Sequence, residues 1–109
     1  MRIQTIAPAL QVLTIADMLA EETFEPVFEQ LENSLPGKCR KVEYSDDYEK
    51  AGKWVLFLHV TFENGGEYDE DGYSHNCTTE RVPFTVALDS TIYNAVRQIV
   101  GEIVSLIED

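Results

Sequence analysis

Hydrophobic residues recur at helical spacing in two stretches of the first third of the chain. Residues 5–23 carry apolar side chains every three or four positions, and Pro8 suits a first helical turn. The apolar positions of this stretch are Leu10, Leu13, Ala16, Leu19 and Ala20. A second helix is predicted from Thr23 or Glu25 to Leu35, with Pro36-Gly37 ending it. Its apolar stripe consists of Phe24, Val27, Phe28, Leu31 and Leu35.

An alternating pattern replaces helical spacing from Cys39 onward. Residues 39–44 predict a short polar strand, residues 45–52 a turn or loop, and residues 53–63 the strongest strand of the sequence. One face of that strand carries Trp54, Leu56, Leu58, Val60 and Phe62, and the other carries Val55, Phe57, His59 and Thr61. A strand that is apolar on both faces normally lies in the middle of a sheet, so we expect neighbours on both sides.

The C-terminal third predicts one more strand and a long helix. Residues 81–88 alternate, and Pro83 places this strand at a sheet edge because proline cannot donate to the ladder. Asp89-Ser90-Thr91 is good helix-capping chemistry, and apolar positions then continue in phase to Glu108. Gly101, inside that helix, is interpreted as marking a close crossing over the sheet.

These elements predict an α+β fold formed by residues 1–109 as a single domain. The expected order is two N-terminal helices, a three-stranded antiparallel sheet with residues 53–63 in the centre, and a C-terminal helix. The helices are expected on the Trp54 face of the sheet. Residues 64–79 form either a long loop or a β-arm, the latter starting from a tight turn at Asn64-Gly65.

Charge then narrows the functional classes. The chain has 20 acidic and 8 basic residues in 109, a net charge of −12, so it repels nucleic acid and anionic membrane surfaces. No apolar run is long enough to span a bilayer, and residues 1–5 lack the features of a secretory signal. We therefore expect a cytoplasmic protein, in which Cys39 and Cys77 stay reduced.

The charges are also distributed unevenly along the chain. Between Ile3 and Gly37 there are six carboxylates and no Lys or Arg, whereas five of the eight bases lie in residues 38–53. Carboxylates three or four residues apart on a helix lie about 5–6 Å from one another, a spacing broadly similar to that of DNA phosphates. The predicted contacts with a partner are an acidic helix stripe and an acidic loop: Glu22, Glu25, Glu29, Glu32, Glu67, Asp69, Glu70 and Asp71.

Motifs for metals or catalysis are weak. Residues 67–72 place carboxylates at positions 1, 3 and 5 and a glycine at position 6 of a calcium loop, but Thr78 stands where a bidentate Glu belongs. Cys39, His59, His75 and Cys77 are zinc-type ligands without zinc-site spacing. We therefore predict no metal and no cofactor. A small enzyme using Cys77 with His75 or His59 is the weakest functional alternative.

Two non-enzymatic hypotheses remain. The first is an acidic inhibitor or DNA mimic that occludes a basic, nucleic-acid-binding surface of another protein. The second is a structural subunit, because the order of elements resembles that of ring-forming phage tail-terminator and neck proteins. Val55 and Phe57 point away from the predicted helices and would support self-association, and thus a homo-oligomer.

Overall fold

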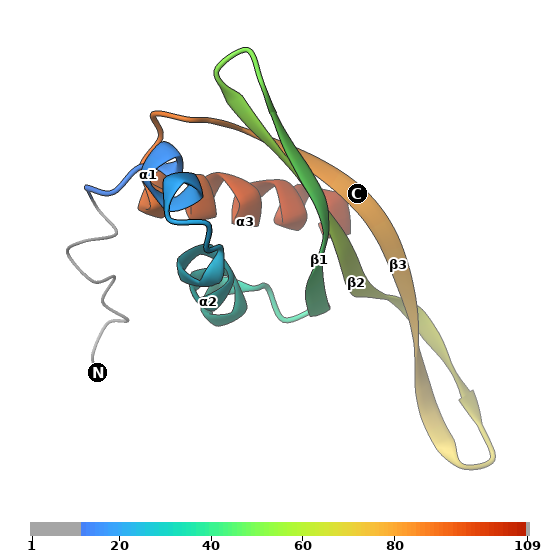
Figure 1. The fold of residues 1–109 in the computed structure, drawn as a ribbon. Coiled ribbons are helices and arrows are strands. Elements are labelled where there is room, and N and C mark those ends of the chain that lie inside the picture. The colour runs from blue at the N-terminus through green and yellow to red at the C-terminus, as the bar shows by residue number, and fades with distance from the viewer. Residues whose placement is uncertain (1–11, 109) are drawn as a thin grey trace, which may run out of the picture.

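A computed structural model describes residues 12–108, except for the side chains of His75 and Glu108. The elements in chain order are α1 (Ile15–Ala20), α2 (Glu25–Ser34), β1 (Cys39–Lys50), β2 (Lys53–Asp69), β3 (Gly72–Ala87) and α3 (Ile92–Glu108). The three strands form one antiparallel sheet in the order β1-β2-β3, and the helices form a layer on one of its faces (Figure 1). The predicted α+β fold is therefore confirmed.

The core lies between the helices and the alternate residues of β2 that face them. Trp54, Leu56, Leu58 and Val60 are fully buried, as the period-two pattern predicts. The neighbouring strand and the helices complete this core with Phe84, Val86, Val27, Leu31, Ile92, Ala95, Ile99 and Ile103. The opposite side of the sheet, which we call the open face, has none of the helices of residues 12–108 against it (Figure 1).

The first helix differs from its prediction. Within the described residues α1 has only six residues, and its buried side chains are Ile15 and Met18 rather than the predicted stripe. Thr14 caps it, because the Thr14 hydroxyl accepts from the Asp17 amide while the Asp17 carboxylate accepts from the Thr14 amide. The expectations at Pro8 and Leu10 lie outside the described residues. The second helix is confirmed, with Val27 and Leu31 buried.

All three strands are longer than predicted. The expected loop at residues 45–52 is wrong, because β1 continues through a bulge between Tyr44 and Asp46 and turns only at Ala51-Gly52. The predicted turn at Asn64-Gly65 is also wrong, since the pairing register shifts there and β2 continues to Asp69. The alternative of a β-arm for residues 64–79 is confirmed, and the long-loop alternative is wrong.

Two single-residue interpretations have opposite outcomes. Pro83 lies on β3, an edge strand, as its missing N–H requires. Gly101 does not mark a close crossing: it is exposed, and a Cβ placed on it would have open space around it. The helix packs through Ile99 and Ile103 instead.

A hydrogen-bond network ties the β1–β2 hairpin to the core. The Asp47 carboxylate accepts from the indole N–H of buried Trp54 at 2.9 Å and from the Tyr44 hydroxyl at 2.6 Å. The hydrogen bond to Asp47, and its negative charge, raise the pKa of Tyr44 to about 12. One carboxylate thus satisfies the only polar atom that Trp54 brings into the core.

Replacing Asp47 with alanine tests this network. We expect Asp47→Ala to lower the free energy of unfolding by about 1–3 kcal/mol, because the buried indole N–H loses its charged acceptor. The pKa of Tyr44 should fall from about 12 toward its ordinary value of 10. Urea denaturation and ultraviolet titration of the phenols measure the two effects.

The pH dependence has a definite sign. Because folding raises the pKa of Tyr44, the stabilisation by its bond to Asp47 is fully present below pH 10 and is lost as the pH rises through about 12.

For the substitution of Asp47, Glu49→Ala is the matched control on the same strand, with an expected change in the free energy of unfolding within about 0.5 kcal/mol. Equal losses in the two variants would contradict the role of Asp47.

Candidate functional site

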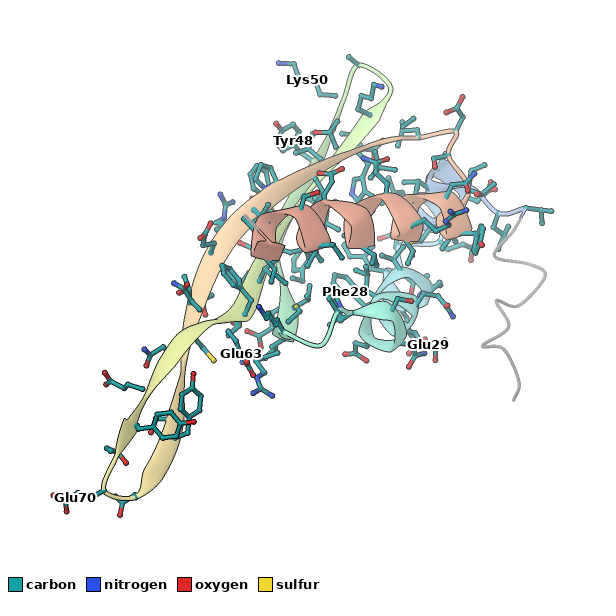
Figure 2. All side chains as sticks on the ribbon, turned by 180° about the vertical axis from the view of Figure 1, so that it is seen from behind. Phe28, Glu29, Tyr48, Lys50, Glu63 and Glu70 are labelled. Carbon is teal, nitrogen blue, oxygen red and sulfur yellow. The ribbon has the colours of Figure 1, made fainter. Side chains whose placement is uncertain are left out.

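The most distinctive feature of the molecule is a β-arm, which we define as residues 64–77. It is the end of the β2–β3 hairpin beyond the Glu63–Cys77 pair, and it extends well past the helical layer (Figures 1 and 2). The register shift between Glu63 and Gly66 marks its base, where the Arg40 guanidinium forms an ion pair with Glu63. The arm therefore begins at the register shift, next to a residue that is tied to β1 by an ion pair.

One side of the arm is aromatic. Tyr68 and Tyr73 are cross-strand partners whose ring centroids lie 4.7 Å apart, and Tyr68 remains 83% exposed. The Tyr73 ring lies over Gly66, because a Cβ at Gly66 would come within 2.6 Å of its Cζ atom. The glycine therefore makes room for an aromatic side chain that covers the backbone.

The end of the arm is acidic, and we call Glu67, Asp69, Glu70 and Asp71 the acidic tip. All four are exposed, and residues 64–79 contain no Lys or Arg. Asp69 also caps the turn, since its carboxylate accepts from the Asp71 amide at 2.8 Å. The residues of the predicted acidic loop therefore lie together at the end of the β-arm, away from the helical layer (Figure 2).

The predicted acidic helix stripe is only partly formed. Glu25, Glu29 and Glu32 are exposed on α2, but Glu22 lies in the turn after α1, with a φ of 56°. The stripe and the acidic tip do not come together: in Figure 2, Glu29 and Glu70 lie on opposite sides of the body. The protein therefore has two acidic surfaces that are separate, not one.

The open face carries a mixed aromatic and basic surface, which we call the open-face patch. It consists of Tyr48, Lys50, Lys53, Val55, Phe57 and Arg81. Val55 and Phe57 are half-buried and point away from the helices, as predicted. The Tyr48 ring lies 6.1 Å from the Phe57 ring, and the Arg81 guanidinium carbon lies 4.1 Å above the same ring.

The cysteines and histidines are not gathered into one site. Cys39 is buried on the helix side of β1, and burial raises the pKa of its thiol. Cys77 is exposed on β3 opposite Glu63, whereas His59 pairs with Arg81, which is roughly 13 Å further along the strand. The Cys77–His59 dyad is therefore not formed. The side chain of His75 lies outside the described part.

Other binding geometry is sparse in the described residues. Residues 12–108 hold no group of three or more His, Cys, Asp or Glu side chains arranged for a metal ion. A depression of about 520 Å³ lies at the ends of α1 and α2. Its polar groups come from Asp17, Glu21 and Thr23, and the Asp17 carboxylate already caps α1.

The acidic tip and the apolar pair of the open face could be predicted from the sequence, but the aromatic and basic side chains beside them could not. Arg81, Tyr48 and Tyr68 gain their importance from cross-strand register, which no short motif reveals.

No helix among the described residues has the length and apolar character needed to cross a bilayer. Among known proteins, no family model, curated protein or solved structure matches this chain.

Proposed function

We propose that this chain is a non-enzymatic protein-interaction module whose β-arm contacts a basic surface of a partner protein. The observation that carries the proposal is the arm itself: four carboxylates and an exposed tyrosine pair on a hairpin that extends beyond the rest of the fold. Glu25, Glu29 and Glu32 on α2 provide a second acidic surface for the same partner or for another one.

Physical reasons favour an intermolecular role for the arm. A two-stranded hairpin has marginal stability in water by itself, and ordering each residue costs about 1–2 kcal/mol of conformational entropy. The Tyr73 ring covers the backbone at Gly66, and Tyr68 stays largely in solvent. Tyrosines of this kind are enriched at protein interfaces, where the ring is buried and the hydroxyl stays hydrogen-bonded.

The charge of the arm favours a basic partner. Carboxylates at the end of a protruding element steer a cationic surface toward it, and the resulting association weakens as salt screens the charges. The same negative potential opposes direct contact with nucleic acid. As part of the proposal we place the protein in the cytoplasm, in keeping with two free cysteines on opposite faces of the sheet.

A second candidate function is that of a structural subunit that assembles with copies of itself. The observation that favours it is the open face, which carries Val55 and Phe57 and has none of the described helices over it (Figure 1). An apolar centre surrounded by charged side chains is typical of a surface that another protein covers.

Photo-crosslinking from the arm tests the proposed function. We would replace Tyr68 by p-benzoylphenylalanine in the full chain and irradiate the cells that produce it. The control has the same replacement at Asn94, which is exposed on α3. We expect protein adducts at position 68 in severalfold excess over position 94. In lysate, the adducts should decrease at about 0.5 M salt, where charge attraction is screened within about 4 Å.

Reversing the charge at the tip provides the second arm of this test. Glu67→Lys/Glu70→Lys leaves the turn cap at Asp69 intact and should abolish the adducts from position 68. Equal adduct yields at positions 68 and 94, or yields that do not respond to the charge reversal, would show that the arm is not the contact element.

A further inference from the structure

We propose that the partner of the β-arm is a second copy of this chain, with the acidic tip of one copy on the open-face patch of the next. This inference rests on the proposed function, because it takes the arm to be a contact element and names what the arm contacts. It differs from contact between two open faces, since each copy contributes a different surface on its two sides.

The clearest sign of an anionic occupant is a pair of like charges. Lys50 and Lys53 are direct cross-strand partners on the open face, at the last pair before the β1–β2 turn. Like charges placed directly opposite each other destabilise a sheet. Neither lysine forms an ion pair with a carboxylate within residues 12–108. An external carboxylate between them would remove this repulsion.

Arg81 extends the basic character toward the middle of the patch. Its guanidinium lies over Phe57, and its Nε donates to the Ser45 hydroxyl at 3.0 Å, so the side chain is held in place. No carboxylate pairs with it in the described chain. Its terminal nitrogens are thus prepositioned donors that can bind a carboxylate with two hydrogen bonds.

The charge balance of this region contrasts with that of the whole chain. The open-face side chains between the β1–β2 turn and the rung of Arg81 include three bases, Lys50, Lys53 and Arg81, against two carboxylates, Asp46 and Glu43, and Glu43 is paired with Lys41. The chain as a whole has a net charge of −12. A basic area with an aromatic centre is therefore complementary to the tip, which joins four carboxylates to a tyrosine pair.

The dimensions and positions of the two surfaces also agree. Asn64 to Asp69 on the arm spans roughly 17 Å of extended strand, and Lys53 to His59 on the open face spans roughly 20 Å. The turn that carries Lys50 and the tip that carries Glu70 lie at opposite ends of the sheet (Figure 2). Opposite ends of opposite charge favour a head-to-tail arrangement.

Such a contact is heterologous, so one copy can bind a neighbour on each side. The contacts produce a ring if the rotation between copies closes and a filament if it does not. The mixed surfaces also explain how a chain with a large negative charge could self-associate: each contact places the acidic tip of one copy on an area of the next copy where bases outnumber acids.

A charge-exchange experiment in the full chain tests the inference. Glu67→Lys/Glu70→Lys changes the arm, and Lys50→Glu/Lys53→Glu changes the patch but preserves a like-charge pair. We expect the wild type to self-associate in sedimentation velocity at about 0.05 M salt and to dissociate at about 0.5 M. Each double variant alone should associate roughly a hundredfold more weakly.

Mixing the variants gives the decisive result. The arm variant keeps an intact patch and the patch variant keeps an intact arm, so an equimolar mixture should form a 1:1 complex. The quadruple variant, which exchanges both charges and keeps the net charge of −12, should regain self-association. Glu21→Lys/Glu102→Lys is the control for net charge, because both residues are exposed and lie outside the two acidic surfaces, and it should associate at least as well as the wild type.

Three results would overturn the inference: a monomeric wild type at low salt, no complex in the mixture, or a quadruple variant that stays monomeric. These results are distinguishable from failure of the proposed function. If position 68 crosslinks to a different protein while the chain remains monomeric, the arm is a contact element but its partner is not a second copy. If position 68 forms no specific adducts, both proposals are wrong.

Discussion

Phe84→Ala should destabilise the protein by about 3–5 kcal/mol, a large part of the 5–15 kcal/mol that is typical of folded domains. Phe84 is fully buried on β3 and pairs with Leu56 at the centre of the sheet. Alanine removes the buried aromatic ring from the core and leaves a cavity between β3 and the helices. Urea denaturation followed by the fluorescence of Trp54 measures the change.

Phe57→Ala is the matched control, because the same substitution is made on the other side of the sheet. Phe57 is only half-buried, on the open face opposite Pro83, so we expect a loss of about 1 kcal/mol. Its larger effect should be on self-association, where it removes the centre of the open-face patch. Equal stability losses at the two positions would mean that the open face is covered within one chain.

This pair of phenylalanines shows why the fold could be predicted from the sequence. In β2 the alternation from Trp54 to Phe62 places one set of residues against the helices and the other set outside, and the structure has that arrangement. Pro83 correctly indicates an edge strand. The period of the apolar positions and the missing N–H of proline are local properties, so they can be recognised in a single sequence.

The errors arise where long-range pairing overrides local preference. Residues 45–50 contain three carboxylates and look like a loop, yet they form a strand because β2 offers a ladder and Asp47 meets the indole of Trp54. Asn64-Gly65 looks like a hairpin turn but forms a bulge within a longer hairpin. Tertiary context decides such segments, and composition alone cannot.

The candidate site was predictable only in part for the same reason. The acidic tip lies within five consecutive residues of the sequence, and Val55 and Phe57 are two positions apart on one strand. The open-face patch, by contrast, joins Lys50 and Arg81 from different strands across β2. Only the register shows that Lys50 and Lys53 face each other and that Arg81 covers Phe57.

Gly66→Val should open the β-arm while leaving the body folded. A side chain at this position would collide with the Ser74 carbonyl oxygen and with the Tyr73 ring, whose hydroxyl would lie 2.5 Å from the new Cβ. Overpacking of this kind costs about 1–3 kcal/mol, and an isolated hairpin has little stability to lose. Valine favours strands more than glycine does, so propensity alone predicts the opposite result.

Hydrogen exchange followed residue by residue separates these two outcomes. We expect the amides of residues 66–75 to lose at least about tenfold in protection, whereas the amides of the β2 residues whose side chains face the core keep theirs, because local openings are independent of global unfolding.

Gly101→Ala controls for the loss of a glycine: Gly101 has open space around it in α3, and alanine there should add about 0.5–1 kcal/mol of stability. If the opened arm still crosslinks and associates like the wild type, its hairpin structure is not what the partner recognises, and a flexible acidic segment would be sufficient. If association is lost together with protection, the ordered pairing of Tyr68 with Tyr73 is part of the contact.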